Sequence, residues 1–355
     1  MKHTIIGGGN IGTLMAAEMA NKGHEVTMYT PRYEKFDGKI KVFDIDDNYL
    51  FEAALTNVTG NIKTAVENAD VVWITVPSIM FGEMSALLFP FIKKGQLIGV
   101  IPGSGGVEFA FKNLIEKGCV LFGFQRVHSI ARLKKYGEAV YMLGRKKSIE
   151  AAAIPSQNIK KVCDMIEKLF DMPCTLLPNY LNVTLTPSNP ILHTARLYSM
   201  FRDYNKGMTY PKNYLFYEEW TDDSSEMLLN MDEELQRLCQ TMPLDLSCVV
   251  SLRKYYESPT IEKMTNKIKN ITAFKGLTSP MIEKSDGWIP DFQSRYFTAD
   301  FCYGLKIIKD LGNLYDVKMP NINLVWKWYE TMDPDNAENA FCSICSREEL
   351  EAMYM

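Results

Sequence analysis

The sequence predicts an α/β domain with a doubly wound parallel sheet, followed by an all-α domain. Over residues 1–179, short apolar runs of strand length alternate with segments of helical periodicity, which is typical of strands joined by crossover helices. A glycine-rich turn connects the first strand to the first helix. Over residues 180–355 the patterns are helical, with no convincing strand. We therefore expect two domains, with an active site in the cleft between them.

The first strand is predicted at residues 3–6 and the first helix at residues 13–21. The turn between them, residues 7–12, reads Gly-Gly-Gly-Asn-Ile-Gly and fits G-x-G-x-x-G in the strand–turn–helix context of a Rossmann dinucleotide site. The N–H groups at the helix start would face a pyrophosphate. An ordinary strand-to-helix loop is the plain alternative. We assign to cofactor binding Gly7, Gly9, Asn10, Ile11 and Gly12.

The end of the second strand, predicted over Glu25–Tyr29, indicates which cofactor is preferred. An NAD site usually carries an acidic residue here for the ribose 2′-hydroxyl, but this chain continues with Thr30, Pro31 and Arg32. A hydroxyl and a guanidinium suit a 2′-phosphate, because arginine offers charge-assisted bidentate donors. We therefore predict NADP in preference to NAD. The alternative is that Arg32 is a solvated loop charge.

The rest of the first domain follows the alternating pattern. Two strands between residues 38 and 55 are joined by a turn at residues 46–48. Later elements are predicted in this order: helix 57–69, strand 70–77, helix 81–92, strand 96–101, helix 107–117, strand 119–124, strand 139–143, helix 159–170 and strand 174–177. Because ligands bind beyond the carboxyl ends of such strands, we expect Val76 and Pro77 to border the nicotinamide.

Composition and charge exclude several classes of function. The 355 residues are 46% hydrophobic and 23% charged, as in ordinary globular proteins. A net charge of −4 argues against nucleic acid as a partner. No apolar stretch approaches the ~20 residues of a membrane span, and no secretory signal precedes the first strand. We expect a cytoplasmic protein without a membrane partner. Its oligomeric state stays open, with a homodimer as one arrangement.

The eight cysteines are scattered, mostly in apolar surroundings, and are interpreted as reduced core residues. Cys342 and Cys345 have C-x-x-C spacing, but the tail offers no histidine to complete a zinc site. We therefore expect no metal and interpret this pair as neighbouring positions on a helix.

The second domain contains the residues suited to acid–base chemistry. Its helices are predicted at residues 191–200, 225–239, 245–256, 261–268, 301–311 and 322–330. His193 follows two prolines and lies in the first turn of a helix. Arg295 and Asp300 bracket an aromatic stretch; the arginine could bind a substrate carboxylate, and the aspartate could orient the imidazole. A structural histidine and a structural ion pair are the plain alternatives.

The sequence resembles the octopine/nopaline (opine) dehydrogenase family over most of its length. The resemblance is carried by the glycine turn and by Phe124-Gln125-Arg126-Val127, Ile130-Ala131-Arg132, Tyr136-Gly137, Asn189-Pro190-Ile191-Leu192-His193-Thr194, Arg295-Tyr296 through Asp300 and Tyr303-Gly304-Leu305. It implies an oxidoreductase acting on CH–NH that joins an α-keto acid to an amino acid and reduces the imine with NAD(P)H. It also implies a helical domain of the 6-phosphogluconate dehydrogenase C-terminal plan.

The same resemblance implies roles for individual residues. His193 would be the general acid/base, Asp300 its partner, Arg295 a ligand for substrate carboxylate and Gln125 a polar substrate contact. The chain departs from the family pattern at His128, where members commonly have proline, and at Ala299, where they have an acidic residue. His128 is therefore interpreted either as a loop residue or as a base in the pocket.

Two other functions remain as alternatives. Ketopantoate reductases share the two-domain plan and the NADP preference, but the lysine and Asn/Glu set of that family has no evident counterpart here. A regulator that senses NADP without turnover is the second alternative, and the combination of His193, Arg295 and Asp300 argues against it.

Overall fold

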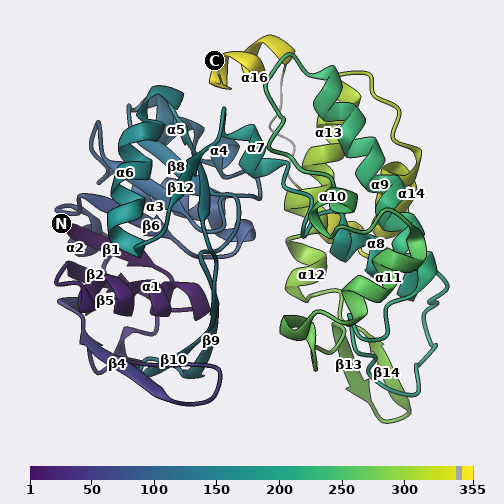
Figure 1. Cartoon of the computed structure of the whole chain (residues 1–355), viewed down its shortest axis with the longest axis horizontal. Coiled ribbons are helices and arrows are strands. Elements are labelled where there is room, and N and C mark those ends of the chain that lie inside the picture. Colours follow the sequence, from purple (N-terminus) through teal and green to yellow (C-terminus); the bar gives the residue numbers. More distant parts are fainter. Residues whose placement is uncertain (341–345, 355) are drawn as a thin grey trace. The chain divides into compact units, whose positions relative to one another are not determined.

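The structure is a computed structural model that describes residues 1–340 and 346–354. Its residues form two compact units, Met1–Thr184 together with Ala352–Met355, and Leu185–Glu351 (Figure 1). The first is the predicted α/β unit and the second is predominantly helical, so the expected fold class is confirmed. Cys342 and Cys345 lie outside the described residues.

An eight-stranded sheet forms the centre of the first unit, in the order β12-β11-β8-β7-β6-β1-β2-β5. Neighbouring strands are parallel except β8 and β11, which are antiparallel. The strands are β1 (Lys2–Ile6), β2 (Glu25–Tyr29), β5 (Asn57–Thr59), β6 (Val71–Ile74), β7 (Leu97–Val100), β8 (Val120–Phe124), β11 (Ile149–Ile154) and β12 (Cys174–Leu176). β1 lies between β2 and β6, where the strand order reverses and doubly wound sheets bind their ligands.

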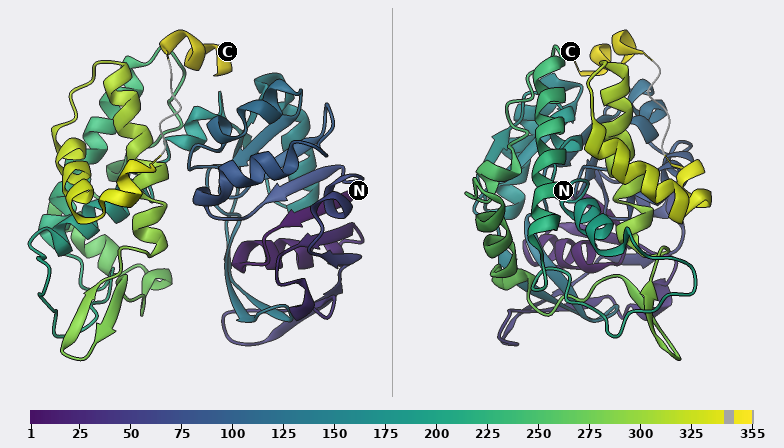
Figure 2. Two further views of the ribbon diagram at one scale, coloured as in Figure 1. Left: turned by 180° about the vertical axis from the view of Figure 1, so that it is seen from behind. Right: turned by 90° about the vertical axis from the view of Figure 1, so that its right-hand side faces the viewer.

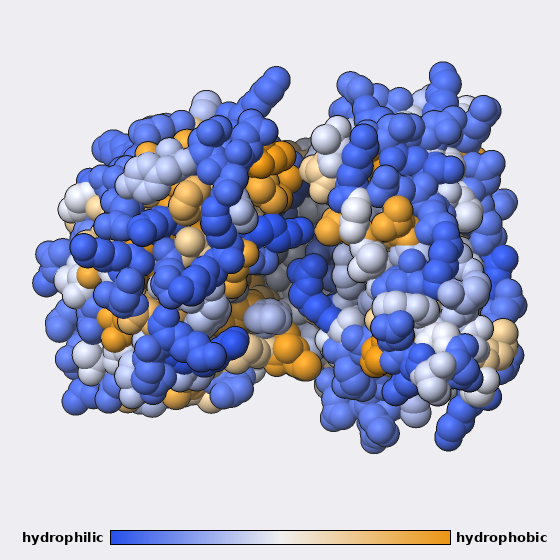
Figure 3. All heavy atoms as spheres, turned by 90° about the horizontal axis from the view of Figure 1, so that it is seen from below, coloured by the Kyte–Doolittle hydropathy of each residue, from blue (hydrophilic) through white to orange (hydrophobic). Residues whose placement is uncertain are grey.

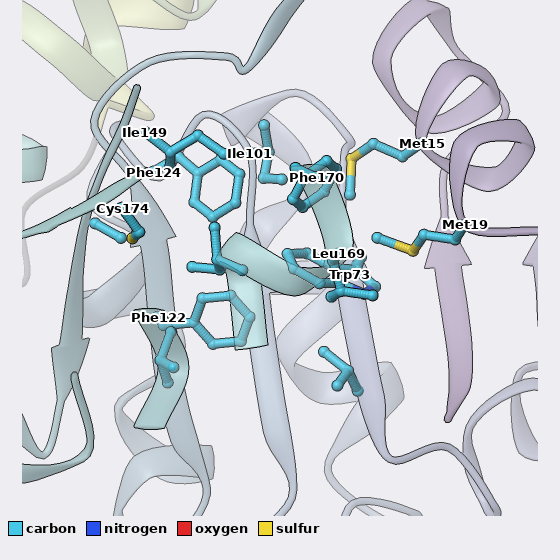
Figure 4. Close-up of a cluster of buried hydrophobic side chains, with 14 of the residues drawn as sticks. Met15, Met19, Trp73, Ile101, Phe122, Phe124, Ile149, Leu169, Phe170 and Cys174 are labelled. Carbon is cyan, nitrogen blue, oxygen red and sulfur yellow. The ribbon is translucent and has the colours of Figure 1, made fainter. Parts of the chain in front are cut away.

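Helices accompany this sheet, and apolar side chains fill the space between them. Trp73 on β6 makes edge-on ring contacts with Phe122, Phe124 and Phe170, with centroids 5.1–6.1 Å apart (Figure 4). Phe170 ends a strongly amphipathic helix, predicted with the correct bounds. The helices are α1 (Asn10–Asn21), α2 (Ile62–Val66), α3 (Phe81–Leu88), α4 (Val107–Ala110), α5 (Lys112–Glu116), α6 (Ile159–Phe170) and α7 (Leu181–Thr184).

A second, smaller sheet packs on the opposite face of α1, with the order β4-β3-β10-β9 (Figure 1). Its strands are β3 (Lys39–Phe43), β4 (Tyr49–Ala54), β9 (Ser129–Lys135) and β10 (Ala139–Arg145). The run 139–143 was predicted to belong to the main sheet, and this was wrong. Val140 and Met142 pack towards α1, while Tyr141 contacts the ring of Phe43. Because the outward-facing side of β10 carries an aromatic residue here, the alternation of apolar and polar residues that marks a half-buried strand is not visible in the sequence.

Two further predictions need correction, and two strands were missed. The segment 57–69 starts as β5, which pairs with β2, and becomes helical only at Ile62, where Asn61 accepts a hydrogen bond from the Thr64 N–H. The helix predicted over 107–117 is interrupted at Phe111. Strands β9 and β11 were not predicted.

The second unit consists of helices and one hairpin. Its helices are α8 (Leu192–Phe201), α9 (Asp222–Thr241), α10 (Leu252–Tyr255), α11 (Ile261–Lys269), α12 (Arg295–Thr298), α13 (Lys306–Leu314), α14 (Pro320–Met332) and α15 (Pro334–Glu338). The last helix, α16 (Arg347–Tyr354), begins in this unit, and its residues from Ala352 on are counted with the first unit. The hairpin of β13 (Met281–Lys284) and β14 (Gly287–Pro290) was not predicted, and it projects from one end of the unit in Figure 2. The helix expected over 245–256 forms only at Leu252–Tyr255.

On the face that Figure 3 shows, hydrophilic residues predominate on both units and hydrophobic ones are scattered among them. None of the helices within the described ranges combines the length and the hydropathy needed to cross a membrane.

Candidate functional site

The three motif glycines of the turn after β1 have three different physical roles. Gly7 has φ = +114°, and a Cβ there would lie 2.8 Å from the Thr75 hydroxyl oxygen, so a side chain is strained as well as obstructed. A Cβ on Gly12 would collide with the carbonyl oxygen of Gly7. Gly9 faces open space. These are the tight turn, the close helix–strand packing and the free approach that a pyrophosphate requires.

The N-terminus of α1 offers its backbone N–H groups. Gly9 is the N-cap residue and provides no side-chain cap, and the first turn carries no acidic residue. The side chains of the two residues that follow are used elsewhere. The Asn10 amide oxygen accepts the Leu133 N–H at 2.9 Å. Ile11 packs against the hydrophobic core at the main sheet and also against the one at the smaller sheet. Asn10 and Ile11 can therefore serve an anion through their backbone N–H groups.

Val76 and Pro77 follow β6 at the same edge of the sheet as the glycine turn. The Thr75 hydroxyl donates to the carbonyl oxygens of Ile6 and Gly7 at 3.0 and 3.1 Å, so the ends of β6 and β1 are tied together. Val76 lies next to the turn, since a Cβ on Gly7 would be 3.2 Å from its side chain. This is the expected border of the cofactor site.

A small cluster of side chains organises the end of β2. The Thr30 and Tyr136 hydroxyls are 3.0 Å apart, and the Arg32 N–H donates to the Thr30 hydroxyl at 3.3 Å. Thr30 is buried, whereas Arg32 is exposed and its guanidinium lies 4.6 Å from the centre of the Tyr136 ring. The Thr30 hydroxyl thus contacts both Tyr136 and the Arg32 backbone, and among the described residues no ion pair is recorded for the Arg32 guanidinium. The contribution of Tyr136 was missed, because it arrives from the turn between β9 and β10, a strand pair of the smaller sheet.

Gln125, predicted to contact substrate, follows β8 and is buried. Its side-chain N–H donates to the Asn182 carbonyl at 2.9 Å, and its side-chain oxygen accepts from Arg126 at 2.9 Å. Both ends of the amide therefore have partners within the first unit.

The side chains of His193 and Asp300 lie in contact in the second unit, as expected for an imidazole and the carboxylate that orients it. His193 Nδ1 lies 2.7 Å from an Asp300 carboxylate oxygen, and both side chains are buried, with 6% and 7% of their surface exposed. A carboxylate at one nitrogen orients an imidazole and stabilises its protonated form. Among the described residues, the ionic partner of Asp300 is thus His193 of the same unit, whereas the plain alternative was an ion pair of Arg295 or Asp300 with the other domain.

The backbone explains how residues 107 positions apart meet. Asp300 precedes a π-helical turn, Phe301–Leu305, which leads into α13. A Cβ on Gly304 would lie 2.9–3.0 Å from side-chain atoms of Pro190, just before α8. The glycine therefore permits the close packing that places Asp300 beside His193, and π-helical turns are frequent at functional sites.

Tyr217 completes this cluster and was missed by sequence analysis. Its hydroxyl lies 2.9 Å from His193 Nε2, so both imidazole nitrogens have partners. Burial, with a smaller contribution from Tyr296, raises the pKa of the Tyr217 phenol well above its usual value. The segment around it is simply aromatic, Phe216-Tyr217-Glu218-Glu219-Trp220, and nothing in that pattern marks one hydroxyl as a histidine partner.

The loop that carries Tyr217 is fastened to α8 by a buried guanidinium. Arg196 donates to the carbonyl oxygens of Phe216 and Glu219, at 3.0 and 2.7 Å, and to the Ser224 hydroxyl at 3.1 Å. Burial lowers the pKa of Arg196 to about 10. Because His193 and Arg196 lie on the same helix, α8 fixes both the imidazole and the loop opposite it.

Arg295 begins α12 and is exposed. Its guanidinium carbon lies 5.8 Å from the centre of the Tyr296 ring, and that ring is 4.8 Å from the His193 ring. Within residues 1–340 and 346–354, no ion pair involves Arg295. A cation near the imidazole is thus available for an anionic ligand.

His128 has the environment of a structural residue. Its side chain is fully buried before β9, 2.7 Å from a Glu18 carboxylate oxygen and 4.5 Å from the Phe170 ring by centroids. This favours the interpretation as a loop residue over that of a base in the pocket. No cluster of three or more potential metal ligands occurs among the residues whose positions are described.

Comparison with known families agrees with this division of the chain. Residues 176–333 match the family model of the NAD/NADP octopine/nopaline dehydrogenase, alpha-helical domain. Residues 2–117 match the model of the NAD-dependent glycerol-3-phosphate dehydrogenase N-terminus.

Two curated relatives cover most of the chain. A tauropine dehydrogenase from Arabella iricolor is 24% identical over 365 residues, which span 93% of this chain and 90% of the relative. An opine dehydrogenase from Haliotis discus hannai is 27% identical over 298 residues, 78% of this chain and 73% of the relative.

Solved structures share the fold of the whole chain. Octopine dehydrogenase with NADH and L-arginine superposes with a TM-score of 0.83 at 22% identity and covers 98% of this chain and 94% of its own. Yersinopine dehydrogenase with NADP⁺ gives 0.68 at 12% identity, covering 96% and 92%. A ketopantoate reductase from Ralstonia eutropha JMP134 gives 0.61 at 14% identity, covering 95% and 99%.

Proposed function

Because this chain belongs to the octopine/nopaline (opine) dehydrogenase family and is an NAD(P)-dependent oxidoreductase acting on CH–NH, we propose that it reductively condenses an α-keto acid with an amino acid. The product is a secondary amine dicarboxylate. The observation that carries this proposal is the buried His193–Asp300 pair, with an N···O distance of 2.7 Å.

The condensation needs protons moved at two points, and His193 is suited to both. The amino group must lose a proton to attack the keto carbon, and the resulting hydroxyl must gain one to leave as water. Asp300 holds Nδ1, which fixes the tautomer and stabilises the imidazolium formed when His193 takes up a proton. Reduced nicotinamide, when bound, supplies the hydride that converts the imine carbon to CH–NH.

Substrate recognition follows from the charges of the two substrates. Both carry a carboxylate, and Arg295 is an exposed guanidinium close to the ring that packs on His193. Arginine binds a carboxylate through two parallel, charge-assisted hydrogen bonds. We assign Arg295 to the carboxylate of the keto acid, since the carbon that reacts is adjacent to that group. Both ends of the Gln125 amide are already hydrogen-bonded. We therefore expect Gln125 to hold neighbouring residues in place rather than to contact the substrate itself.

The cofactor site supports a preference for NADP. Gly7, Gly9 and Gly12 fit a dinucleotide pyrophosphate, and Arg32, held by Tyr136 and the Thr30 hydroxyl, is a cation where an NAD site has a carboxylate. In Arg32→Ala, we expect KM for NADPH to rise about tenfold, the loss of one charge-assisted contact, and KM for NADH to stay unchanged. An equal change for both cofactors would contradict the assignment.

The function is tested by measuring oxidation of NADPH and NADH over a matrix of α-keto acids and amino acids. We expect turnover only when both substrates are present, with a secondary amine product identified by mass spectrometry. Turnover of ketopantoate without an amine would instead identify a ketopantoate reductase. Cofactor binding without turnover of any pair would favour an NADP sensor.

A further inference from the structure

His193 has no nitrogen left for direct contact with a substrate. Asp300 occupies Nδ1 at 2.7 Å, and the Tyr217 hydroxyl occupies Nε2 at 2.9 Å. A general acid must lie within hydrogen-bond distance of the atom it protonates. Either Tyr217 leaves when substrate binds, or the proton passes through its hydroxyl.

The packing of Tyr217 argues against its departure. Its ring stacks on Phe274 with centroids 4.1 Å apart and planes 19° apart, and Phe216 contacts it at 4.9 Å. On a third side, the Trp220 ring is parallel within 6° at 6.4 Å. Aromatic pairs of this kind stabilise a fold beyond the burial of their surface, so moving the ring out would disrupt several of these contacts at once.

The backbone of Tyr217 is fixed as well. Arg196 donates to the carbonyl oxygens of Phe216 and Glu219, one residue before Tyr217 and two after it. The donor is buried and lies on α8, the helix that carries His193. Ring and backbone are therefore both held with the hydroxyl on Nε2.

From this geometry we propose that Tyr217 is the terminal proton donor of a relay, Asp300–His193–Tyr217, and that its hydroxyl touches the reacting oxygen of the condensation intermediate. This deepens the proposed function and rests on it. Tyr217 is a catalytic residue in this scheme, while Asp300 and Arg196 are positioning residues.

The relay balances in protons and involves no redox step. When the intermediate loses water, the phenolic O–H bond breaks as an O–H bond forms to the departing hydroxyl. The phenolic oxygen recovers a proton from His193 Nε2–H, and the imidazolium beside Asp300 becomes neutral. The imidazolium proton came from the substrate ammonium group, through the same relay in the opposite direction, when the amine was prepared for attack. An ordinary phenol is already protonated at neutral pH, and burial raises the pKa of Tyr217 further.

Tyr217→Phe tests the relay because it removes the hydroxyl and keeps the ring. We expect kcat to fall about 10²-fold, the lower end of the range for proton transfer, with KM values for both substrates little changed. Tyr198→Phe is the matched control: it lies on α8, and its ring packs edge-on against Trp328 at 5.6 Å. It should keep wild-type kcat.

The outcomes separate the relay from the function on which it rests. If the wild type turns over and Tyr217→Phe keeps full kcat, the relay is overturned and the function stands. If no substrate pair is turned over by the wild type, both fall. Should Tyr217→Phe fold poorly, site-specific replacement of Tyr217 by a fluorinated tyrosine of lower phenol pKa replaces it. The alkaline limb of the kcat profile should then move to lower pH, and an unmoved limb would overturn the relay.

Discussion

The two buried histidine–carboxylate pairs of this protein, one in each unit, have the same N···O distance. His128 lies 2.7 Å from Glu18 in the first unit, and His193 lies 2.7 Å from Asp300 in the second. Both carboxylates come from segments far away in the sequence, Glu18 from α1 and Asp300 from the turn before Phe301–Leu305, separated from their histidines by 110 and 107 positions. By contact alone, the pairs cannot be told apart.

Their surroundings differ in the group at the other nitrogen and in the nearest charges. Among the residues that the structure describes, none is a hydrogen-bond partner of His128 Nδ1. The ring is fully buried against Phe170, and Arg145 lies 3.8 Å from the second oxygen of Glu18. His193 Nε2 carries the Tyr217 hydroxyl, and its ring retains slight exposure. A histidine–carboxylate contact therefore does not by itself identify an acid–base site. A proton path beyond the imidazole is what distinguishes the pair in the second unit.

The largest expected effect is on activity, and it should occur in one pair alone. His193→Ala should lower kcat by about 10²–10⁴-fold, the usual contribution of a general acid/base. His128→Ala should keep kcat near the wild-type value. It should instead lower the free energy of unfolding by about 1–3 kcal/mol, because Glu18 loses its buried partner. Steady-state kinetics and thermal denaturation of both variants check this.

A loss of kcat in His128→Ala without loss of stability would break the comparison. It would mean that the pair in the first unit also takes part in chemistry. A His193→Ala variant with near-normal kcat would also contradict the comparison, because the pair in the second unit would then have no part in the chemistry.

A third buried carboxylate shows what happens without an imidazole. Glu108 on α4 is fully buried, and its carboxyl accepts hydrogen bonds from the hydroxyls of Thr184 and Tyr354. Burial raises the pKa of Glu108 from 4.5 to about 7. The folded state therefore holds a proton that the unfolded state releases, and this stabilisation is complete below pH ~4.5 and lost as pH rises through ~7.

Glu108→Gln, which mimics the protonated acid, should accordingly become more stable than the wild type as pH rises from 5 to 8. The stability difference should grow by about 3 kcal/mol, the equivalent of the shift in pKa. Chemical denaturation of both proteins across this range measures it. A difference that does not change with pH would show that Glu108 is ionised throughout.

A smaller effect should come from the packing that creates the catalytic pair. Gly304→Ala pushes against Pro190 and should displace Asp300 from His193, so we expect about a tenfold loss of kcat, because sub-ångström misplacement of reacting groups is costly. Gly82→Ala is the control, since a Cβ on this glycine of α3 meets no atom within 4 Å. It should leave kcat unchanged. Equal kcat in both variants would show that the helix packing tolerates a methyl group.

The predictions that succeeded depended on short stretches of sequence. The turn at residues 7–12, the strand that ends before Thr30 and the amphipathic helix α6 each depend on fewer than 20 consecutive residues, and the structure forms all three. The smaller sheet was not predicted because β10 has apolar side chains on both faces. The hairpin of β13 and β14 is too short to interrupt a helical pattern.

Prediction from short stretches of sequence was limited in the same way for the site in the second unit. His193 and Asp300 could be paired from the family resemblance, but periodicity and spacing alone could not connect helices so far apart in the chain. Tyr217 belongs to an aromatic segment in which every ring is a reasonable core residue. Its partnership with Nε2 depends on how Arg196 holds the loop, which is a tertiary contact without a sequence signature.

The position of α1 between two sheets has a consequence for engineering the cofactor preference. Both sides of this helix are packed. Met15 and Met19 pack against the main sheet (Figure 4), and Leu14 and Ala17 pack against the smaller one. Substitutions there would disturb two cores at once. Designers who wish to exchange the two nicotinamide dinucleotides should leave the helix intact and vary the exposed residues that follow β2, Pro31 and Arg32.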